Sequence, residues 1–385
     1  MNDRKSSWLA AASAFVVLLW MAGSVGQAGT ITVYTATVLG TLGGSASQAY
    51  GINDSGQVVG SSSTATSTRA FLYSSATGMT NLGTLSGVSS ATGINSGGQV
   101  AGNSGDYAFL YSSSTGMSSL GSLGGGWSDA YGINDSGQVV GDSYTASYAD
   151  HAFLYSSSKG MTDLGTLGGS TSTAYGINNS GQIVGDSYTA SGADHAFLYN
   201  SGSSSAKMLD LGTMGGADSQ ANAINNGGQI VGWSDTASGA SHAFLYTYSS
   251  GSATMTAADD LGTLGGSTSD ALAINNDAEV VGLSYTSSGA MDAFLYTDGT
   301  MEDLVTSMGS ALAGWTNTEA TGINDAGDIV GFGTYDGVTQ AFLLTPEQVD
   351  QPSAAVPEPV SMIFFATGLV AVGGYVAKRR MLRQG

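Results

Sequence analysis

At 385 residues the chain is long enough for one large repeat domain or two ordinary domains. Cysteine is absent, which excludes disulfides and thiolate metal sites, and only 10% of the residues are charged. The formal net charge of −20 would repel a phosphate backbone and argues against nucleic acid as a partner.

The N-terminus has the pattern of a secretory signal peptide. Arg4 and Lys5 give a basic start, residues 8–22 form an apolar core, and Gly26 and Ala28 place small residues at the −3 and −1 positions of a cleavage site. We therefore expect a signal peptide over residues 1–28 and export of the mature chain. A retained membrane anchor is the alternative.

Residues 29–345 consist of seven repeats of about 45 residues, a period typical of four-stranded propeller blades. Each repeat contains a Gly/Ala-Ile-Asn triplet followed by a run similar to Ala-Phe-Leu-Tyr. The asparagines are Asn53, Asn95, Asn134, Asn178, Asn225, Asn275 and Asn324, and the phenylalanines are Phe71, Phe109, Phe153, Phe197, Phe244, Phe294 and Phe342. In the fourth repeat we expect strands at 173–178, 182–186, 195–200 and 207–211.

Two local patterns support this division of the repeats. The Asn-Asp-Ser-Gly type turns after each triplet suit tight hairpins, because asparagine bonds the following backbone and glycine adopts positive φ. The unbroken apolar run of the third strand predicts a strand that is buried on both faces, as between stacked blades.

The first repeat is preceded by a segment that resembles a displaced fourth strand. Residues 30–38 are rich in β-branched residues and lead into Leu-Gly-Thr-Leu-Gly-Gly, which elsewhere follows a repeat, whereas the seventh repeat ends at Thr345 without such a segment. We expect residues 31–42 to pair beside 341–344 and close a ring. The predicted fold is an all-β, seven-bladed β-propeller; a parallel β-solenoid with separated ends is the alternative.

Composition changes after Thr345. All four prolines lie in residues 346–359, which we predict to be a linker. Residues 360–377 are apolar and uncharged, and residues 378–385 are basic, so this part predicts a transmembrane helix with a cytoplasmic tail.

The C-terminal region resembles a PEP-CTERM sorting signal. The resemblance rests on Pro357, Glu358 and Pro359, on the apolar span and on the closing basic cluster of Lys378, Arg379 and Arg380. It implies recognition by an exosortase, cleavage near the PEP motif, and delivery to the cell surface of an exopolysaccharide-producing Gram-negative bacterium.

The repeats resemble the extracellular HAF repeat family, through His-Ala-Phe triplets that begin at His151, His195 and His242. The other four repeats replace the histidine with Arg69, Tyr107, Asp292 and Gln340. That family implies an extracellular location but no assigned chemistry, and the histidines are interpreted as polar residues at the start of a strand rather than as a metal or catalytic site.

Three sets of residues are candidates for function. The histidines form one. The acids and amides of the turns after the triplets form another, whose oxygens leave calcium open as a cofactor, although none has EF-hand spacing. The third set is aromatic and lies where the repeats differ, as is usual for binding residues on a fixed scaffold: Trp127, Tyr144, Tyr188, Trp233, Tyr285 and Trp315.

The sequence thus predicts an exported surface or matrix protein that is not an enzyme and whose aromatic residues contact polysaccharide. No residue is predicted to be catalytic, and none to ligate a metal. A secreted hydrolase or lyase acting on polysaccharide is the alternative.

Overall fold

The computed structural model describes residues 30–203, 207–248, 254–306 and 311–350. Residues 34–346 belong to one compact unit, and residues 30–33 with 347–350 belong to another. The predicted signal peptide, PEP motif, transmembrane helix and basic tail lie outside the described residues. Within the described part of the chain, no helix is long and apolar enough to cross a membrane.

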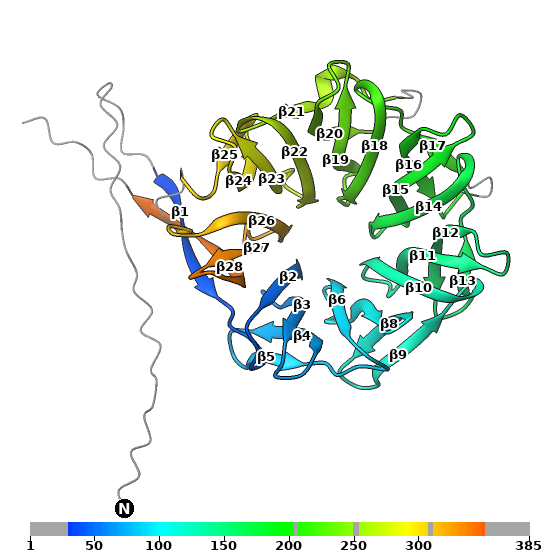
Figure 1. Ribbon diagram of the computed structural model, residues 1–385, viewed down its shortest axis with the longest axis horizontal. Coiled ribbons are helices and arrows are strands. Elements are labelled where there is room, and N and C mark those ends of the chain that lie inside the picture. Colours follow the sequence, from blue (N-terminus) through cyan, green and yellow to red (C-terminus); the bar gives the residue numbers. More distant parts are fainter. Residues whose placement is uncertain (1–29, 204–206, 249–253, 307–310, 351–385) are drawn as a thin grey trace, which may run out of the picture. The chain divides into compact units, whose positions relative to one another are not determined.

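Seven four-stranded antiparallel sheets form the blades of a propeller in the first unit (Figure 1). The prediction of a seven-bladed β-propeller is confirmed. The first blades are β2 (Ser47–Ile52), β3 (Val58–Ser63), β4 (Thr68–Ser74) and β5 (Gly78–Asn81) in blade 1; β6 (Ser89–Ile94), β7 (Val100–Ser104), β8 (Tyr107–Ser112) and β9 (Gly116–Gly121) in blade 2; and β10 (Gly124–Ile133), β11 (Val139–Thr145), β12 (Asp150–Ser156) and β13 (Gly160–Asp163) in blade 3.

The remaining blades follow the same order from the axis outward (Figure 1). They are β14 (Gly168–Ile177), β15 (Gln182–Thr189), β16 (Asp194–Asn200) and β17 (Met208–Asp210) in blade 4; β18 (Gly215–Ile224), β19 (Gln229–Thr236), β20 (Ser241–Thr247), the 3₁₀ turn η1 (Ala257–Asp259) and β21 (Asp260–Gly262) in blade 5; β22 (Gly265–Ile274), β23 (Val280–Thr286), β24 (Met291–Thr297) and β25 (Thr300–Asp303) in blade 6; and β26 (Thr316–Ile323), β27 (Ile329–Tyr335), β28 (Val338–Asp350) and β1 (Thr30–Val38) in blade 7.

The ring closes through the N-terminal strand, as predicted. Strand β1 is the outermost strand of blade 7 and is hydrogen-bonded to β28. The backbone N–H of Leu39 donates to the carbonyl oxygen of Ala341 at 3.0 Å, and the equivalent bond in blade 3 joins Leu164 to Ala152 at 2.9 Å. The closing junction therefore repeats the geometry of a blade whose four strands are consecutive.

Several predicted boundaries differ from the structure: the second strand of blade 4 continues to Thr189, beyond the predicted end at residue 186. The linker does not begin at residue 346, because β28 continues to Asp350, where the Gln348 amide donates to the Thr32 hydroxyl at 3.0 Å. In blade 4 the first strand begins at Gly168, five residues before the predicted start at Thr173. In each of these places a polar or proline-containing segment is held in a strand by pairing with a partner strand, which local sequence does not reveal.

The core lies between the blades. All seven phenylalanines of the third strands, and the alanine before each, are fully buried, which confirms burial on both faces. Phe197 of blade 4 packs with Val140 and Ala152 of blade 3. At the closing junction Phe71 packs in the same way with Val330 and Ala341.

A glycine in each second strand allows this packing. In blade 4 a Cβ atom on Gly185 would overlap the carbonyl oxygen of Thr173 on the neighbouring strand, and would lie 2.9 Å from the ring of Phe197. The glycine in the second strand of each repeat is thus explained by close approach of the backbone and of the core phenylalanine.

Candidate functional site

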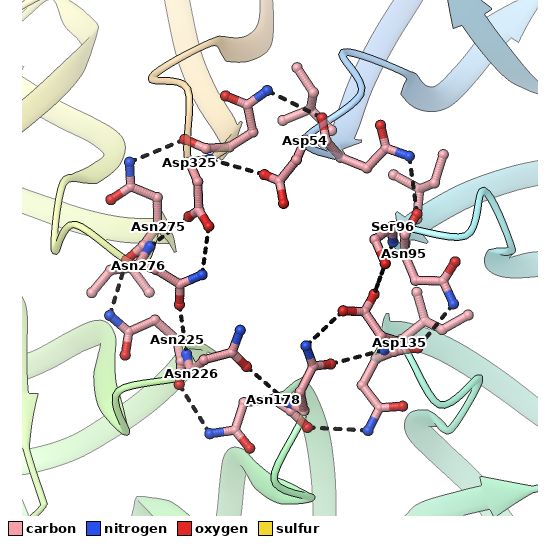
Figure 2. A pocket seen from close by; sticks show the side chains of 18 of the residues that line it. Asp54, Asn95, Ser96, Asp135, Asn178, Asn225, Asn226, Asn275, Asn276 and Asp325 are labelled. Atoms are coloured by element: carbon pink, nitrogen blue, oxygen red, sulfur yellow. Dashed lines mark hydrogen bonds between the residues drawn. The ribbon is translucent and has the colours of Figure 1, made fainter.

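A ring of buried asparagines surrounds the propeller axis, at the hairpins between the first and second strands (Figure 2). The Nδ2 atom of each triplet asparagine donates to the backbone carbonyl oxygen of the asparagine in the next blade, at 3.0–3.2 Å. The last of these bonds runs from Asn324 back to Asn53. The triplet asparagines therefore clamp all seven blades, including the closing pair.

The same side chains also hold their own hairpins. Each asparagine Oδ1 accepts from the backbone N–H four residues later at 2.8–3.0 Å. Hairpin chemistry was predicted for these residues, and it is confirmed. The bonds between blades were not predicted, because they join residues about one repeat apart in sequence.

The residues that follow the triplets form a second, exposed ring: Asp54, Ser96, Asp135, Asn179, Asn226, Asn276 and Asp325. At six of the seven junctions the backbone N–H donates to the side-chain oxygen of the residue in the next blade, at 2.9–3.1 Å. At the seventh junction, from Asp54 in blade 1 to Ser96 in blade 2, the serine hydroxyl instead donates to the Asp135 carboxylate of blade 3 at 2.6 Å.

These two rings, with the isoleucine of each triplet, line a pocket of about 240 Å³ on the axis. Its charged groups are the carboxylates of Asp54, Asp135 and Asp325. The Ser96 hydroxyl, followed by the Ser96 N–H and the Asn179 amide, holds the pKa of Asp135 below its usual value. The pocket suits a small polar or cationic molecule. The acids of the turns, which were considered as separate loops in the sequence, converge in this pocket.

The arrangement of side chains at the turns does not support a metal site there. Among the described residues, no group of three or more His, Cys, Asp or Glu side chains is arranged to hold a metal ion. The carboxylates of the axial pocket instead accept hydrogen bonds from the neighbouring blades.

A titratable carboxyl group lies between blades 5 and 6. Asn222 donates to Asp270 Oδ1 at 2.8 Å and to the carbonyl oxygen of Ala271 at 2.9 Å. Burial raises the pKa of Asp270 to about 7; the hydrogen bond from Asn222 opposes the shift, and the nearby charge of Glu319 adds to it. The folded chain therefore binds a proton at Asp270 more tightly than the unfolded chain does.

We expect this group to make stability fall as pH rises. The stabilising effect of the proton is present below about pH 4 and is lost as pH passes through the folded pKa near 7. Asp270→Asn keeps an acceptor for Asn222 and removes the titration. It should raise the melting temperature at pH 8 by roughly 2–5 °C and flatten the pH dependence between pH 4 and 8.

Thermal unfolding at several pH values, compared with Asp106→Asn at an exposed site, measures this effect. Equal pH profiles for the two variants would show that Asp270 does not titrate as described.

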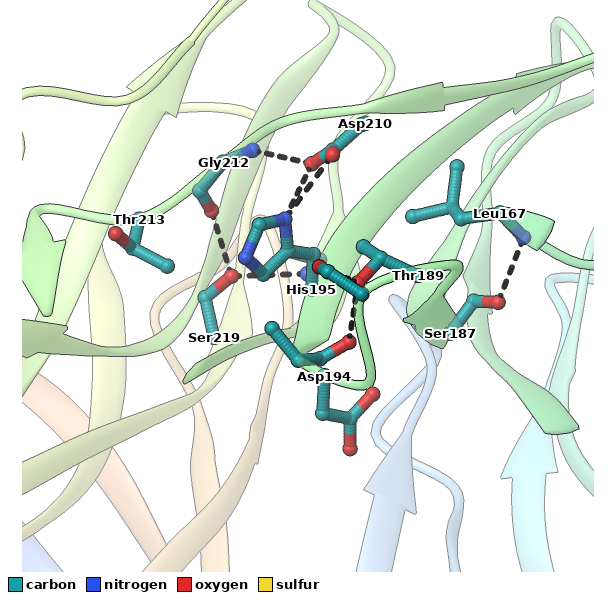
Figure 3. A network of polar contacts seen from close by, with 12 residues as sticks. Leu167, Ser187, Thr189, Asp194, His195, Asp210, Gly212, Thr213 and Ser219 are labelled. Carbon is teal, nitrogen blue, oxygen red and sulfur yellow. Dashed lines mark hydrogen bonds and ion pairs between the residues drawn. The ribbon is translucent and has the colours of Figure 1, made fainter. Parts of the chain in front are cut away.

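The three histidines each pair with an aspartate of the fourth strand, and Figure 3 shows the pair of His195 and Asp210. Nδ1 lies 2.9–3.0 Å from the carboxylate in the pairs His151–Asp163, His195–Asp210 and His242–Asp260. These pairs join the third and fourth strands of blades 3, 4 and 5, as expected of polar residues at strand starts, and they stand one blade apart.

A serine near each pair does not complete a catalytic triad. Ser219 Oγ accepts from the N–H of Ala196 at 2.9 Å and donates to the carbonyl oxygen of Gly212 at 2.6 Å, so it bonds backbone rather than His195 (Figure 3). The equivalent Ser47 accepts from Ala341 at 3.0 Å across the closing junction. These serines form a second set of clamps between blades.

Four of the six predicted aromatic contacts lie at the end of the propeller opposite the asparagine ring. Antiparallel strands place the hairpin between second and third strands, and the start of each first strand, at that end. Tyr144, Tyr188 and Tyr285 are the penultimate residues of β11, β15 and β23, with exposed fractions of 37%, 42% and 39%. Trp127 contacts Tyr144, with ring centroids 4.9 Å apart.

The other two predicted contacts are placed differently. Trp315 is 5% exposed and packs on Tyr335 and Phe342, with ring centroids at 5.0 and 5.4 Å. Its prediction as a ligand contact is wrong, because the turn before β26 directs it into the core. Trp233 lies half-buried within β19, opposite Gln220, and not among the exposed tyrosines.

Tyr148, the most exposed aromatic residue of the described chain at 77%, was not among the six predicted contacts. It lies on the hairpin between β11 and β12 with φ of +61°, where asparagine or glycine is more usual. The positive φ of Tyr148 arises in the folded hairpin. In the sequence, only the tyrosine of Ala-Ser-Tyr-Ala-Asp distinguishes this turn.

Comparisons with known proteins assign no function to the chain. Residues 211–343 match a family described as "Protein of unknown function (DUF3466)". A search of curated proteins finds no match.

Solved structures of similar shape share little sequence with the chain. YCF48 bound to D1 peptide is 13% identical, with a TM-score of 0.45, over 84% of this chain and 97% of that one. TolB from Acinetobacter baumannii is 13% identical, with a TM-score of 0.42, over 76% of this chain and 82% of that one. A putative gluconolactonase is 10% identical, with a TM-score of 0.39, over 83% of this chain and 94% of that one.

Proposed function

We propose that the chain is an exported propeller that binds polysaccharide through the exposed tyrosines at one end of the ring. The observation that carries the proposal is the gathering of apolar surface at that end. Of nine large apolar or aromatic side chains that are exposed in the described residues, only Ile31 and Val38 lie on β1. The other seven lie at the tyrosine end: Leu85, Val88, Tyr107, Tyr144, Tyr148, Tyr188 and Tyr285.

The arrangement suits a long ligand. Tyr144, Tyr188 and Tyr285 occupy one structural position in blades 3, 4 and 6, so their rings are spaced around the face by the blades themselves. A tyrosine offers an apolar ring face and a polar hydroxyl, and so matches the alternating C–H and hydroxyl surfaces of a sugar chain. A polymer can contact several such positions at once, which increases its overall affinity.

The negative charge of the chain favours an uncharged polysaccharide as the ligand. The segment between residues 29 and 356 holds three basic residues against 27 acids, so an anionic polymer would be repelled. Export and sorting to the cell surface, by the segments at residues 1–28 and 357–380, complete the proposal; they are supported by the sequence patterns at the two ends.

Removing the tyrosine rings should weaken binding. We expect Tyr144→Ala, Tyr188→Ala and Tyr285→Ala combined to weaken binding to the preferred neutral glycan by at least about tenfold, equivalent to ~1.4 kcal/mol. The matched triple Tyr→Phe variant keeps the rings and should retain most of the affinity.

A glycan array followed by titration of the full chain measures this, with neutral and acidic polysaccharides in parallel. Binding of the alanine variant equal to that of the phenylalanine variant, or binding to acidic glycans alone, would contradict the proposal.

A further inference from the structure

Blades 3 and 4 each hold a pair of aspartates, one buried and one half-buried, at equivalent positions. The first member lies in the second strand and the second member begins the third strand: Asp142 with Asp150, and Asp186 with Asp194. Asp142 is 5% exposed and Asp186 is 8% exposed. The Oδ1 atom of each of the four carboxyl groups is enclosed and has no hydrogen-bond partner among the described residues.

Only blades 3 and 4 carry acids at both positions; blade 2 has Asn103 at the first and Asp106 at the second. At the two equivalent positions, blades 5, 6 and 7 carry Trp233 and Ser241, Leu283 and Met291, and Phe332 and Thr339, while blade 1 carries Ser61 and Thr68. The fold therefore accepts apolar or neutral residues at both positions. Two buried acids side by side call for an explanation of their own.

Blade 2 shows how a polar side chain at the first of these positions can be hydrogen-bonded. Asn103 occupies the position of Asp142, and its Oδ1 accepts from the backbone N–H of Ala130 at 2.7 Å. The Oδ1 atoms of the aspartate pairs have no such donor. The positions in blades 3 and 4 thus present acceptor oxygens that the protein itself leaves unsatisfied.

The surroundings of the pairs supply further oxygens but little positive charge. The side chains of Tyr131 and Tyr175 lie beside Asp142 and Asp186. Asp129 adds negative charge in blade 3, and Asp218 accepts from the N–H of Asp194 at 2.9 Å in blade 4. The neighbouring histidines are bonded through Nδ1 to other aspartates.

We propose that each aspartate pair binds a divalent cation of the calcium type, one in blade 3 and one in blade 4. Calcium takes six to eight oxygen ligands, and carboxylates, hydroxyls and water are all suitable. Each pair provides two carboxylates, and the half-buried Asp150 and Asp194 lie at the tyrosine end, where an ion and its waters can enter. A cation removes the cost of burying like charges together.

Without a cation, a proton takes its place. Burial, followed by the charge of Asp150, raises the pKa of Asp142, and burial, followed by the charge of Asp194, raises the pKa of Asp186. Binding of a cation displaces a proton that the pair holds. Proton release distinguishes this site from an exposed one, where the carboxylates are already ionised.

The test uses the full chain after treatment with a chelator. Calorimetric titration with calcium chloride should give two ions per chain, with release of protons that depends on the buffer. Terbium, a luminescent substitute for calcium, should be sensitised by Tyr131 and Tyr175.

Asp142→Asn with Asp186→Asn should remove both ions, and each single variant should remove one. Folding of these variants is checked by their thermal unfolding, and asparagine already occupies this position in blade 2 as Asn103. The control replaces the axial acids Asp54, Asp135 and Asp325 with asparagine and should keep both ions. The proposal is overturned if wild-type chain binds no calcium, if the Asp142/Asp186 variant binds as wild type, or if the axial variant loses the ions.

Discussion

Replacing Asn178 by alanine should lower the melting temperature of the protein by roughly 5–10 °C, the largest loss expected from a single substitution outside the apolar core. Asn178 is 3% exposed. Its Nδ2 donates to the Asn225 carbonyl oxygen at 3.0 Å and to Gln182 at 2.7 Å, and its Oδ1 accepts from two backbone N–H groups.

The cost arises from the groups that are left behind. Alanine leaves a buried carbonyl oxygen and a hairpin N–H without partners, and each unsatisfied group costs about 1–3 kcal/mol. We therefore expect a destabilisation of ~3 kcal/mol. It should act at the boundary between blades 4 and 5, where the clamp runs.

Urea and thermal unfolding of Asn178→Ala measure this destabilisation. The control is Asn179→Ala, the adjacent asparagine, which is exposed and bonds to Asp135 at 2.7 Å. We expect the control to lose less than about 1 kcal/mol. If both variants were destabilised equally, the buried ring would not be the clamp described.

The repeat period and the incomplete seventh repeat were sufficient to predict the ring. A segment that resembles a fourth strand precedes the first repeat, and the last repeat lacks one. In a closed ring the leading segment therefore supplies the missing strand of the last blade. The closing segment was predicted at residues 31–42, and the strand in the structure is Thr30–Val38. Closure could be inferred because it depends only on the order of segments along the chain.

The candidate sites were harder to predict because they depend on convergence between blades. Asn178 bonds to its own hairpin and to the next blade, and only the first role is visible in the local sequence. Asp54 and Asp325 are neighbours on the axis although 271 residues separate them. Their shared pocket follows from the ring and not from either turn.

Local pattern also failed to separate exposed from buried aromatic residues. Trp127 and Trp315 stand at similar points of their repeats, yet Trp127 remains partly exposed beside Tyr144 while Trp315 packs between Tyr335 and Phe342. The difference arises because the connection before β26 buries Leu312 and turns the tryptophan inward. The three tyrosines were predicted more successfully because their position in the second strand is the same in each blade.

Closure of the ring is the central claim, and the absence of cysteine allows a direct test of it. Thr37 stands two residues before Leu39, as Thr162 stands two residues before Leu164, and Thr162 pairs with Leu154 across β12 and β13. The same register in blade 7 places Thr37 opposite Leu343. A disulfide there would close a loop of about 300 residues and stabilise the fold by up to ~5 kcal/mol.

The measurement is cross-linking of the Thr37→Cys/Leu343→Cys variant under mild oxidation, followed by electrophoresis without reductant and by thermal unfolding. Our account predicts near-complete cross-linking in the folded protein and a higher melting temperature that reductant reverses. Thr37→Cys with Leu110→Cys, which places the second thiol at the equivalent position of blade 2, should remain unlinked. A Thr37→Cys/Leu343→Cys protein that folds but does not cross-link, or that links no better than this control, would contradict the closed ring.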